Sequence, residues 1–274
     1  MLTGAAFGAA GTFSGTGRYL APNNWSGKAV PKVNDGADDF LSGHAFATNE
    51  TETLEGGQWM HIGNTAASGL GILDLYNTNY KIKDLRIGCD SYKQGGWGCY
   101  CQKGGSLTGG SVSIGWAQYA PVHVGATMTL EDVTASGLAV TLGNDESAGG
   151  LKTDDRLVVS GGSFTANSLA IGSGHQGSVL FTNTAVTITE VSHPFLNGKS
   201  EDSAELVVKD STWKSSNEGF TIAGGADSFG KAVFADCPSV DFFKPRVGHG
   251  ANSTGWLTLS NCVVRNTWER DVRR

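Results

Sequence analysis

Eight side chains could take part in metal or acid–base chemistry, because they are carboxylates or an imidazole in Gly-rich or polar loops. Carboxylate oxygens are hard ligands that could hold Ca²⁺. Two carboxylates at the right separation could also act as acid and base in glycoside cleavage. The alternative is a charged loop face that only keeps a Gly-rich protein soluble. The eight residues are Asp145, Glu146, Asp154, Asp155, Glu201, Asp202, Asp227 and His249.

A second group of candidates is aromatic. The segment 88–105, GCDSYKQGGWGCYCQKGG, concentrates Tyr92, Trp97 and Tyr100 among glycines and three cysteines. Aromatic rings on a loop with little other apolar support stack on sugar rings or anchor a partner protein; alternatively, they fold down to cover an edge of the fold. Three cysteines are an incomplete zinc site, and no close histidine supplies a fourth ligand. We therefore predict glycan or partner binding by these aromatics, with no metal and no cofactor.

Composition excludes several classes of protein. The 274 residues include 40 glycines without the three-residue period of collagen, and only 17% are charged, so a coiled coil or helical bundle is excluded. A net charge of −6 argues against nucleic acid as a partner. Five cysteines are not a secreted disulfide framework. No apolar stretch reaches membrane-spanning length, and the first twenty residues lack the features of a Sec signal, so we expect no membrane insertion.

One five-residue pattern recurs along the chain, and it sets the expected architecture. It reads apolar, any, apolar, any, then Asp, Asn or Gly, as in LVVKD from Leu206. The spacings from one start to the next are 20, 25, 23, 29, 22, 27, 26 and 25 residues. The nine copies start at Met60, Tyr80, Gly105, Met128, Leu157, Val179, Leu206, Ala232 and Leu257.

Each copy predicts a short strand with one buried face, followed by a turn at the Asp, Asn or Gly. A unit of about 25 residues cannot bury its apolar face alone, whereas stacked units can, and this makes a solenoid of parallel strands. From their positions in the repeat, we expect Phe181, Phe234 and Trp213 to lie in the core of the solenoid. The runner-up fold is an all-β jelly roll or sandwich, which the fixed period disfavours.

Cys237 and Cys262 each follow a repeat start by five residues, at Ala232 and Leu257. We therefore expect their side chains to stack in adjacent coils. A structural thiol ladder is favoured over a redox function, because reduced thiols are the rule in a cytoplasm.

The pattern resembles the right-handed, single-stranded parallel β-helix of the pectate lyase-like superfamily, which includes pectinolytic enzymes and bacteriophage tailspikes. The resemblance covers residues 58–274 and implies an all-β solenoid of about nine coils, with residues 1–57 as an N-terminal arm and cap. Gly248, His249 and Gly250 are similar to the Gly-His-Gly of polygalacturonases. The other parts of that motif are missing, since the Asp154–Asp155 pair lies over ninety residues upstream. No catalytic set is assigned.

The resemblance implies a non-enzymatic virion protein of a bacteriophage, which is tailspike-like, a fibre tip or a decoration protein. We expect a homotrimer that contacts other virion proteins or the host cell-surface polysaccharide, made in the host cytoplasm without a signal peptide. The arm, poor in large apolar residues, should order only against a sister subunit or neighbouring protein. The alternative is a polysaccharide-degrading lyase or hydrolase; a cell-associated adhesin is a third possibility.

Overall fold

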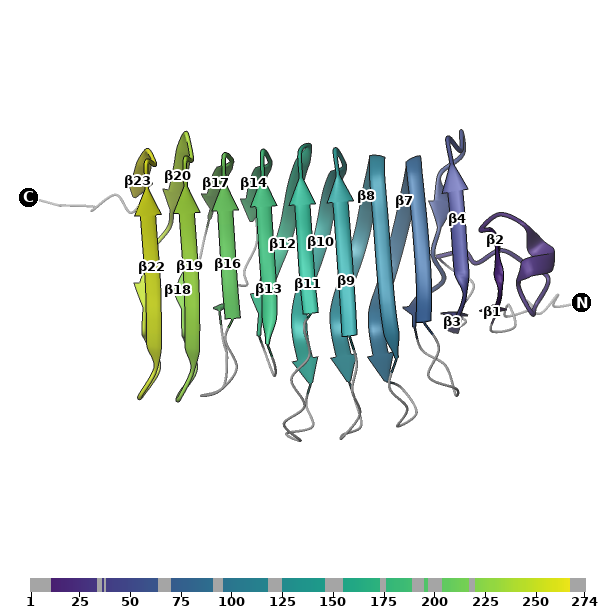
Figure 1. Ribbon diagram of the computed structural model, residues 1–274, viewed down its shortest axis with the longest axis horizontal. Helices are drawn as coiled ribbons and strands as arrows, with labels where there is room; N and C mark the ends of the chain where they lie inside the picture. Colours follow the sequence, from purple (N-terminus) through teal and green to yellow (C-terminus); the bar gives the residue numbers. More distant parts are fainter. Residues whose placement is uncertain are drawn as a thin grey trace, which may run out of the picture.

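The chain is a β-solenoid in which parallel strands stack coil upon coil along one long axis (Figure 1). The computed structural model describes residues 11–33, 36, 38–63, 70–90, 96–117, 125–145, 155–172, 176–188, 195–196, 204–216 and 220–266. Among these residues the strands pair in parallel, apart from an isolated antiparallel bridge between Phe13 and Trp25. The predicted fold class, an all-β parallel solenoid, is confirmed.

Each coil passes through three walls. The first wall holds β2 (Thr16–Arg18), β4 (His44–Thr48), the starts of β7 (Leu70–Asp90) and β8 (Trp97–Ala117), β9 (Gly125–Glu131), β11 (Asp155–Ser160), β13 (Gly177–Thr182), β16 (Ala204–Lys209), β19 (Phe229–Ala235) and β22 (Thr254–Ser260).

The second wall holds β5 (Leu54–Glu55), the middle of β7 and β8, the starts of β10 (Thr134–Asp145) and β12 (Ser163–Ile171), β14 (Ala185–Ile188), β17 (Thr212–Ser215), β20 (Ser239–Phe242) and β23 (Val264–Asn266). The third wall holds β1 (Thr12–Phe13), β3 (Asp38–Leu41), β6 (Trp59–Ile62), the ends of β7, β8, β10 and β12, β15 (Phe195–Leu196), β18 (Thr221–Ile222) and β21 (Arg246–Val247).

The corner after the first wall has left-handed backbone at the same position in each coil from Asn49 onward. Asn, Asp and Gly tolerate a positive φ better than other residue types, which is why the pattern ends on them. Asn49 at φ 52° and Asp236 at φ 55° are examples. The full column is Asn49, Asn77, Gly104, Asp132, Gly161, Asn183, Asp210, Asp236 and Asn261. The predicted turn position is therefore confirmed for the six copies from Met128 onward, whereas Asp84, the fifth residue of the copy at Tyr80, lies inside the continuous strand β7.

Six of the nine predicted repeat copies lie in one column of the first wall. Register joins Met128, Leu157, Val179, Leu206, Ala232 and Leu257, each on a strand next to its neighbour. For the other three copies, which start at Met60, Tyr80 and Gly105, the predicted place in this column is wrong. Met60 pairs with Leu85 in the third wall, whereas Tyr80 pairs with Leu107 in the second.

The true first-wall copies in these early coils start at Ala45, Leu73 and Tyr100, in the sequences AFATN, LDLYN and YCQKG. Gly105 pairs with Thr78, just past the corner. Any strand with one buried face shows the same alternation, so the pattern by itself does not tell one wall from another.

The core lies between the three walls, where aromatic side chains stack on aromatic ones and aliphatic side chains on aliphatic ones in successive coils. Phe181, Phe234 and Trp213 are buried, as predicted, and the Trp213 ring packs edge-on against both phenylalanines at centroid distances of 6.2 and 5.5 Å. In the third wall, an inward aliphatic column is formed by Ile62, Ile87, Ile114, Leu142 and Ile171. This column and the aromatic stack hold successive coils in register.

The predicted boundary at residue 57 does not coincide with a break in the sheet. β3 pairs with β6 and β4 pairs with β7, so residues before 58 already form coils. Within this region, the 3-10 helix η1 (Pro22–Asn24) leads into Trp25. Trp25 packs edge-on against Tyr19 and Phe13, each at a centroid distance of 5.3 Å.

Residues 11–30 are therefore ordered against their own chain, and the expectation that they order only on another subunit is wrong for this part. The cause is the small set of large side chains in this segment, namely Phe13, Tyr19 and Trp25, which are all buried. Residues 1–10 of the predicted arm lie outside the described residues.

The opposite end of the solenoid leaves inward-facing side chains uncovered by the described residues. Leu259 and Val264 continue the buried columns of Phe234 and Val240, yet they are 43% and 42% exposed. Val247, in the third wall, is 44% exposed. The last coil therefore packs against a neighbour on one side only.

Candidate functional site

The structure separates the three predicted aromatic residues. Tyr92 lies outside the described residues. Trp97, the first residue of β8, is 48% exposed and covers Gly125, where an added Cβ would lie 2.3 Å from the indole ring. Tyr100 instead faces the interior, stacks on Tyr80 and donates a hydrogen bond to Oε1 of Gln102 at 2.7 Å. Tyr100 is a core residue, and a direct binding role for it is a wrong prediction, because first-wall register turns it inward.

The predicted acidic loop site is only partly described. Glu146, Asp154, Glu201 and Asp202 lie outside the described residues, and Asp145 is described only by its backbone at the end of β10. Asp155 is not a solvated loop residue, since it begins β11 and is buried. Its carboxylate occupies the space left by Gly115, where an added Cβ would lie 1.7 Å from Oδ2.

Asp227 and His249 lie on loops of adjacent coils, and both are exposed. The backbone N–H of Asp227 donates to the carbonyl of Ala251 at 2.8 Å, and that of His249 donates to the carbonyl of Ala223 at 3.1 Å. Gly250 allows this close approach, because an added Cβ would lie 1.8 Å from the carbonyl oxygen of Gly225. Within the described part of the chain, no three His, Cys, Asp or Glu side chains are grouped so that they could hold a metal ion.

A polar cluster on the outer face of the first wall was not predicted. Nε2 of His44 lies 2.7 Å from Oδ2 of Asp74. Asp74 pairs in register with Cys101 of the next coil, and Cys99 lies two residues before it on the same face. The signal in the sequence is the 27-residue spacing of Asp74 and Cys101, which becomes visible only when Leu73 and Tyr100 are taken as repeat starts.

This cluster does not produce a reactive thiol. Burial raises the pKa of Cys101 to about 11, and the charge of Asp74 adds to the rise. Burial and Asp74 also raise the pKa of Cys99. A thiol that stays protonated at neutral pH is a poor nucleophile and a poor metal ligand. The cluster is therefore a hydrogen-bonded patch of the outer wall.

The outer face of the first wall changes character further along. The residue directly after each repeat start faces outward, and these residues form a column across the coils. The column begins with Asp74, Cys101 and Thr129, and the next four residues in it are apolar. We call these four residues the apolar strip: Val158, Leu180, Val207 and Val233. They make the runs LVV, VLF, LVV and AVF apolar on both faces, which is typical of a parallel sheet covered on both sides.

A shallow hollow of about 350 Å³ lies over the strip, between β11, β13 and β16. Val158, Leu180 and Val207 line it, with Arg156 and Glu205 at its rim. Nζ of Lys231, from the next coil, lies 2.9 Å from Oε1 of Glu205. The strip is thus an apolar surface with charged groups along one side, which is the usual composition of a protein-binding patch.

Comparison with protein-family models, with curated proteins and with solved structures finds no match for this chain. The described residues contain no helix that is long and apolar enough to span a membrane.

Proposed function

We propose that this chain is a non-enzymatic structural protein of a bacteriophage particle, in the manner of a tailspike, fibre tip or decoration protein. It self-associates, as a homotrimer, and contacts neighbouring virion proteins or the host surface glycan. The parallel solenoid and the resemblance of its repeat to phage β-helices support the proposal. Fold alone does not imply function, and the outer surface supplies the more specific support.

The apolar strip is the observation that carries self-association. Four apolar side chains in successive coils, about 4.8 Å apart, form a flat ridge on a rigid wall. They are only partly buried in the single chain. Contiguous apolar surface of this kind marks contacts with other proteins. Aliphatic side chains suit another protein surface better than a sugar, which stacks on aromatic rings.

Trp97 is the residue we assign to glycan contact. Its indole is about half exposed, and it lies on the same outer wall as the strip but four coils nearer the N-terminus than Val207. Trimer contact and glycan contact can therefore be separated by mutation. Trp97→Ala should weaken retention on a host-polysaccharide column and leave association unchanged.

The experiment places a charge in the strip. Leu180→Glu and Val207→Glu should convert the oligomer into a monomer, measured by light scattering coupled to size-exclusion chromatography at micromolar concentration. The matched control is Thr187→Glu, an outward residue of the second wall in the coil of Leu180. Circular dichroism should show the same β content in all four proteins.

A wild-type protein that is monomeric at micromolar concentration would overturn self-association. An oligomer that survives both strip variants would move the interface elsewhere on the solenoid. For the particle role, an antibody raised against the chain should label purified virions, and the absence of labelling would overturn it.

Glycan cleavage is the second candidate, and the hollow is the observation that favours it. It brings a guanidinium, Arg156, and a carboxylate, Glu205, to the same outer surface. Incubation with capsular polysaccharides should then release new reducing ends or unsaturated products, and Glu205→Gln should abolish the release. No products from any glycan that binds the protein would exclude this candidate.

A further inference from the structure

The last two coils place two cysteines at one position of the corner after the first wall. Ala235 of β19 pairs with Ser260 of β22, and Cys237 and Cys262 each follow two residues later. The backbone N–H of Val263 donates to the carbonyl of Cys237 at 3.1 Å, which keeps the coils in register through the corner. The predicted stacking of the two cysteines in adjacent coils is therefore confirmed.

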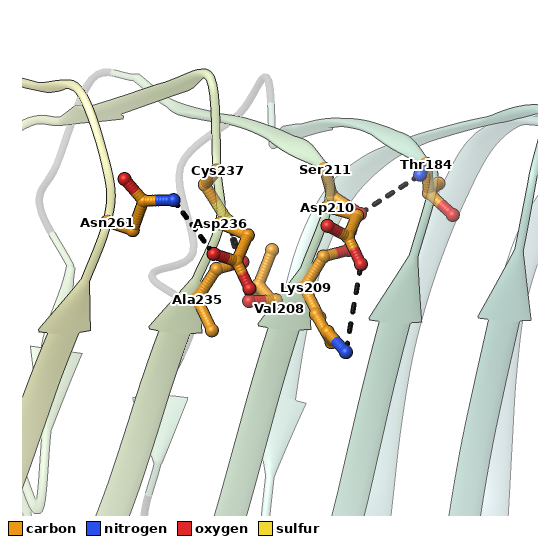
Figure 2. A network of polar contacts seen from close by, with 9 residues as sticks. All are labelled: Thr184, Val208, Lys209, Asp210, Ser211, Ala235, Asp236, Cys237 and Asn261. Atoms are coloured by element: carbon orange, nitrogen blue, oxygen red, sulfur yellow. Dashed lines mark hydrogen bonds and ion pairs between the residues drawn. The ribbon is translucent and has the colours of Figure 1, made fainter.

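The two thiols also point the same way. Sγ of Cys237 lies 3.3 Å from the carbonyl oxygen of Ala235, and Sγ of Cys262 lies 3.1 Å from that of Ser260. Each thiol thus donates to the carbonyl two residues earlier. Hydroxyls do the same in preceding coils, where Oγ of Ser211 donates to the carbonyl of Lys209 at 2.7 Å. Figure 2 shows Thr184, Ser211 and Cys237 in this column, next to the column of corner residues Asp210, Asp236 and Asn261.

We propose that Cys237 and Cys262 form an oxidisable pair whose disulfide fastens the terminal coil to the coil before it. Register neighbours in parallel strands are about 4.8 Å apart, which falls within the Cα separations of disulfides, about 4.4–6.8 Å. The Cys262 thiol is also near enough to raise the pKa of the Cys237 thiol. Formation of the bond requires each thiol to rotate away from the carbonyl to which it donates.

The oxidant is a small disulfide of the glutathione class. Cys237 is buried and Cys262 is partly exposed, so the oxidant reaches Cys262 first. The Cys262 thiolate attacks the oxidant, forms a mixed disulfide and releases one small thiolate. The Cys237 thiolate then attacks the sulfur of Cys262 and releases the second. The two protons lost by the cysteines pass to the two released thiolates, so two thiols are oxidised and one disulfide is reduced.

The second step should be slow at neutral pH. Burial raises the pKa of the Cys237 thiol, and the neighbouring Cys262 thiol raises it further, against a lowering contact with the backbone of Ser211. Only the thiolate attacks a disulfide, so closure should accelerate as the pH rises.

A control pair of cysteines lies in β8. Cys99 and Cys101 are alternate residues of one extended strand and are about 6.6 Å apart, near the limit for bridging.

The structural consequence concerns the end of the solenoid. The bond would close a loop from residue 237 to residue 262 that contains β20, β21 and β22. The last of these carries Leu259, which is 43% exposed and, within the described residues, packs against a neighbouring coil on one side only. Fastening the corner reduces the opening of this strand, because a disulfide restricts the unfolded chain more than the folded one.

The experiment equilibrates the full chain with oxidised and reduced glutathione, traps free thiols by alkylation and maps disulfides by mass spectrometry. We expect a peptide linked through Cys237 and Cys262, absent in Cys262→Ser and present in the Cys99→Ser/Cys101→Ser variant. Amide hydrogen exchange in β22 should slow on the order of tenfold in the oxidised protein. Dithiothreitol should reverse both changes in the wild-type protein, so the comparison does not depend on a variant that folds.

Three results would overturn the proposal. The first is no linkage between Cys237 and Cys262 after equilibration at about pH 8, in protein whose β content is unchanged. The second is a mixed disulfide on Cys262 that persists without closure. The third is a linkage that forms but leaves hydrogen exchange in β22 unchanged, which would remove the fastening of the terminal coil.

Discussion

Asn261 and Asp236 occupy the same corner position in adjacent coils, and Nδ2 of Asn261 donates a hydrogen bond to Oδ1 of Asp236 at 2.9 Å (Figure 2). Asn77 and Asn49 make the equivalent contact at the other end of the solenoid, at 3.0 Å. Both contacts join residues that have left-handed backbone. At the corner, Asn and Asp therefore have two roles. They adopt the left-handed backbone of the turn, and their side chains form hydrogen bonds that hold adjacent coils in register.

The corner should be sensitive to residues that resist a positive φ. Asn183 has a φ of 51°, and its N–H donates to the carbonyl of Lys209 at 3.2 Å. Asn183→Val should lower the free energy of unfolding by about 1–2 kcal/mol, because left-handed backbone costs a β-branched residue about that much. Urea denaturation measures the change. Asn183→Gly is the matched control and should stay within about 0.5 kcal/mol of the wild type. Equal losses in the two variants would contradict a backbone cause.

The aromatic stack should contribute heavily to stability. Trp213 is buried, and its ring packs edge-on against Phe220 at a centroid distance of 5.8 Å and against Phe234 at 5.5 Å. Trp213→Ala should cost about 4 kcal/mol, because it removes a large buried ring and leaves a cavity that the parallel walls cannot close. The neighbouring Lys214, exposed on the same strand, supplies the control Lys214→Ala. A cost below about 1 kcal/mol for Trp213→Ala would show that the core repacks.

Stability should fall as the pH is lowered below the ordinary pKa of histidine. Burial, together with the charge of Arg86 and against that of Asp84, lowers the pKa of His61 to about 4. Between about pH 4 and pH 6.5, His61 is protonated in the unfolded chain but neutral in the folded chain. The contribution of neutral His61 is therefore present above about pH 6.5 and is lost as the pH falls, by about 2 kcal/mol from pH 7 to pH 5.

Urea denaturation of the wild type and of His61→Gln at several pH values measures this effect. Gln cannot titrate, so the variant should lose less stability between pH 7 and pH 5 than the wild type does. A wild-type and a His61→Gln curve of the same slope would show that other groups cause the acid sensitivity.

Core substitutions should cost less in the last coil than in the middle of the solenoid. Leu206 is buried in β16 between two neighbouring coils, whereas Leu259 in β22 is 43% exposed. Leu206→Ala should lower the free energy of unfolding by about 3 kcal/mol, and Leu259→Ala by less than about 1 kcal/mol. Chemical denaturation gives both values. A loss for Leu259→Ala as large as that for Leu206→Ala would mean that this end is covered in solution.

The sequence by itself determined the architecture of this protein and the phase of its later coils. From Met128 onward, the alternation of apolar residues and the Asp, Asn or Gly at the fifth position recur at regular spacing. These local requirements, one buried face and one left-handed corner, are properties of single residues, so they can be read without a structure. The stacking of Cys237 and Cys262 followed from this phase alone, because both residues lie at one offset from the corner.

Only the tertiary structure decided which wall each early strand joins. β7 and β8 run through all three walls as single continuous strands, so the local pattern near Tyr80 and Gly105 fits more than one wall. Met60 lies on β6, which joins the third wall through its pairing with β7. Pairing between coils selects the wall. That selection turns Tyr100 into the core, places His44 against Asp74, and gathers Val158, Leu180, Val207 and Val233 into one outer strip. These are contacts between residues 22 to 30 positions apart, and their partners are fixed by register rather than by local preference.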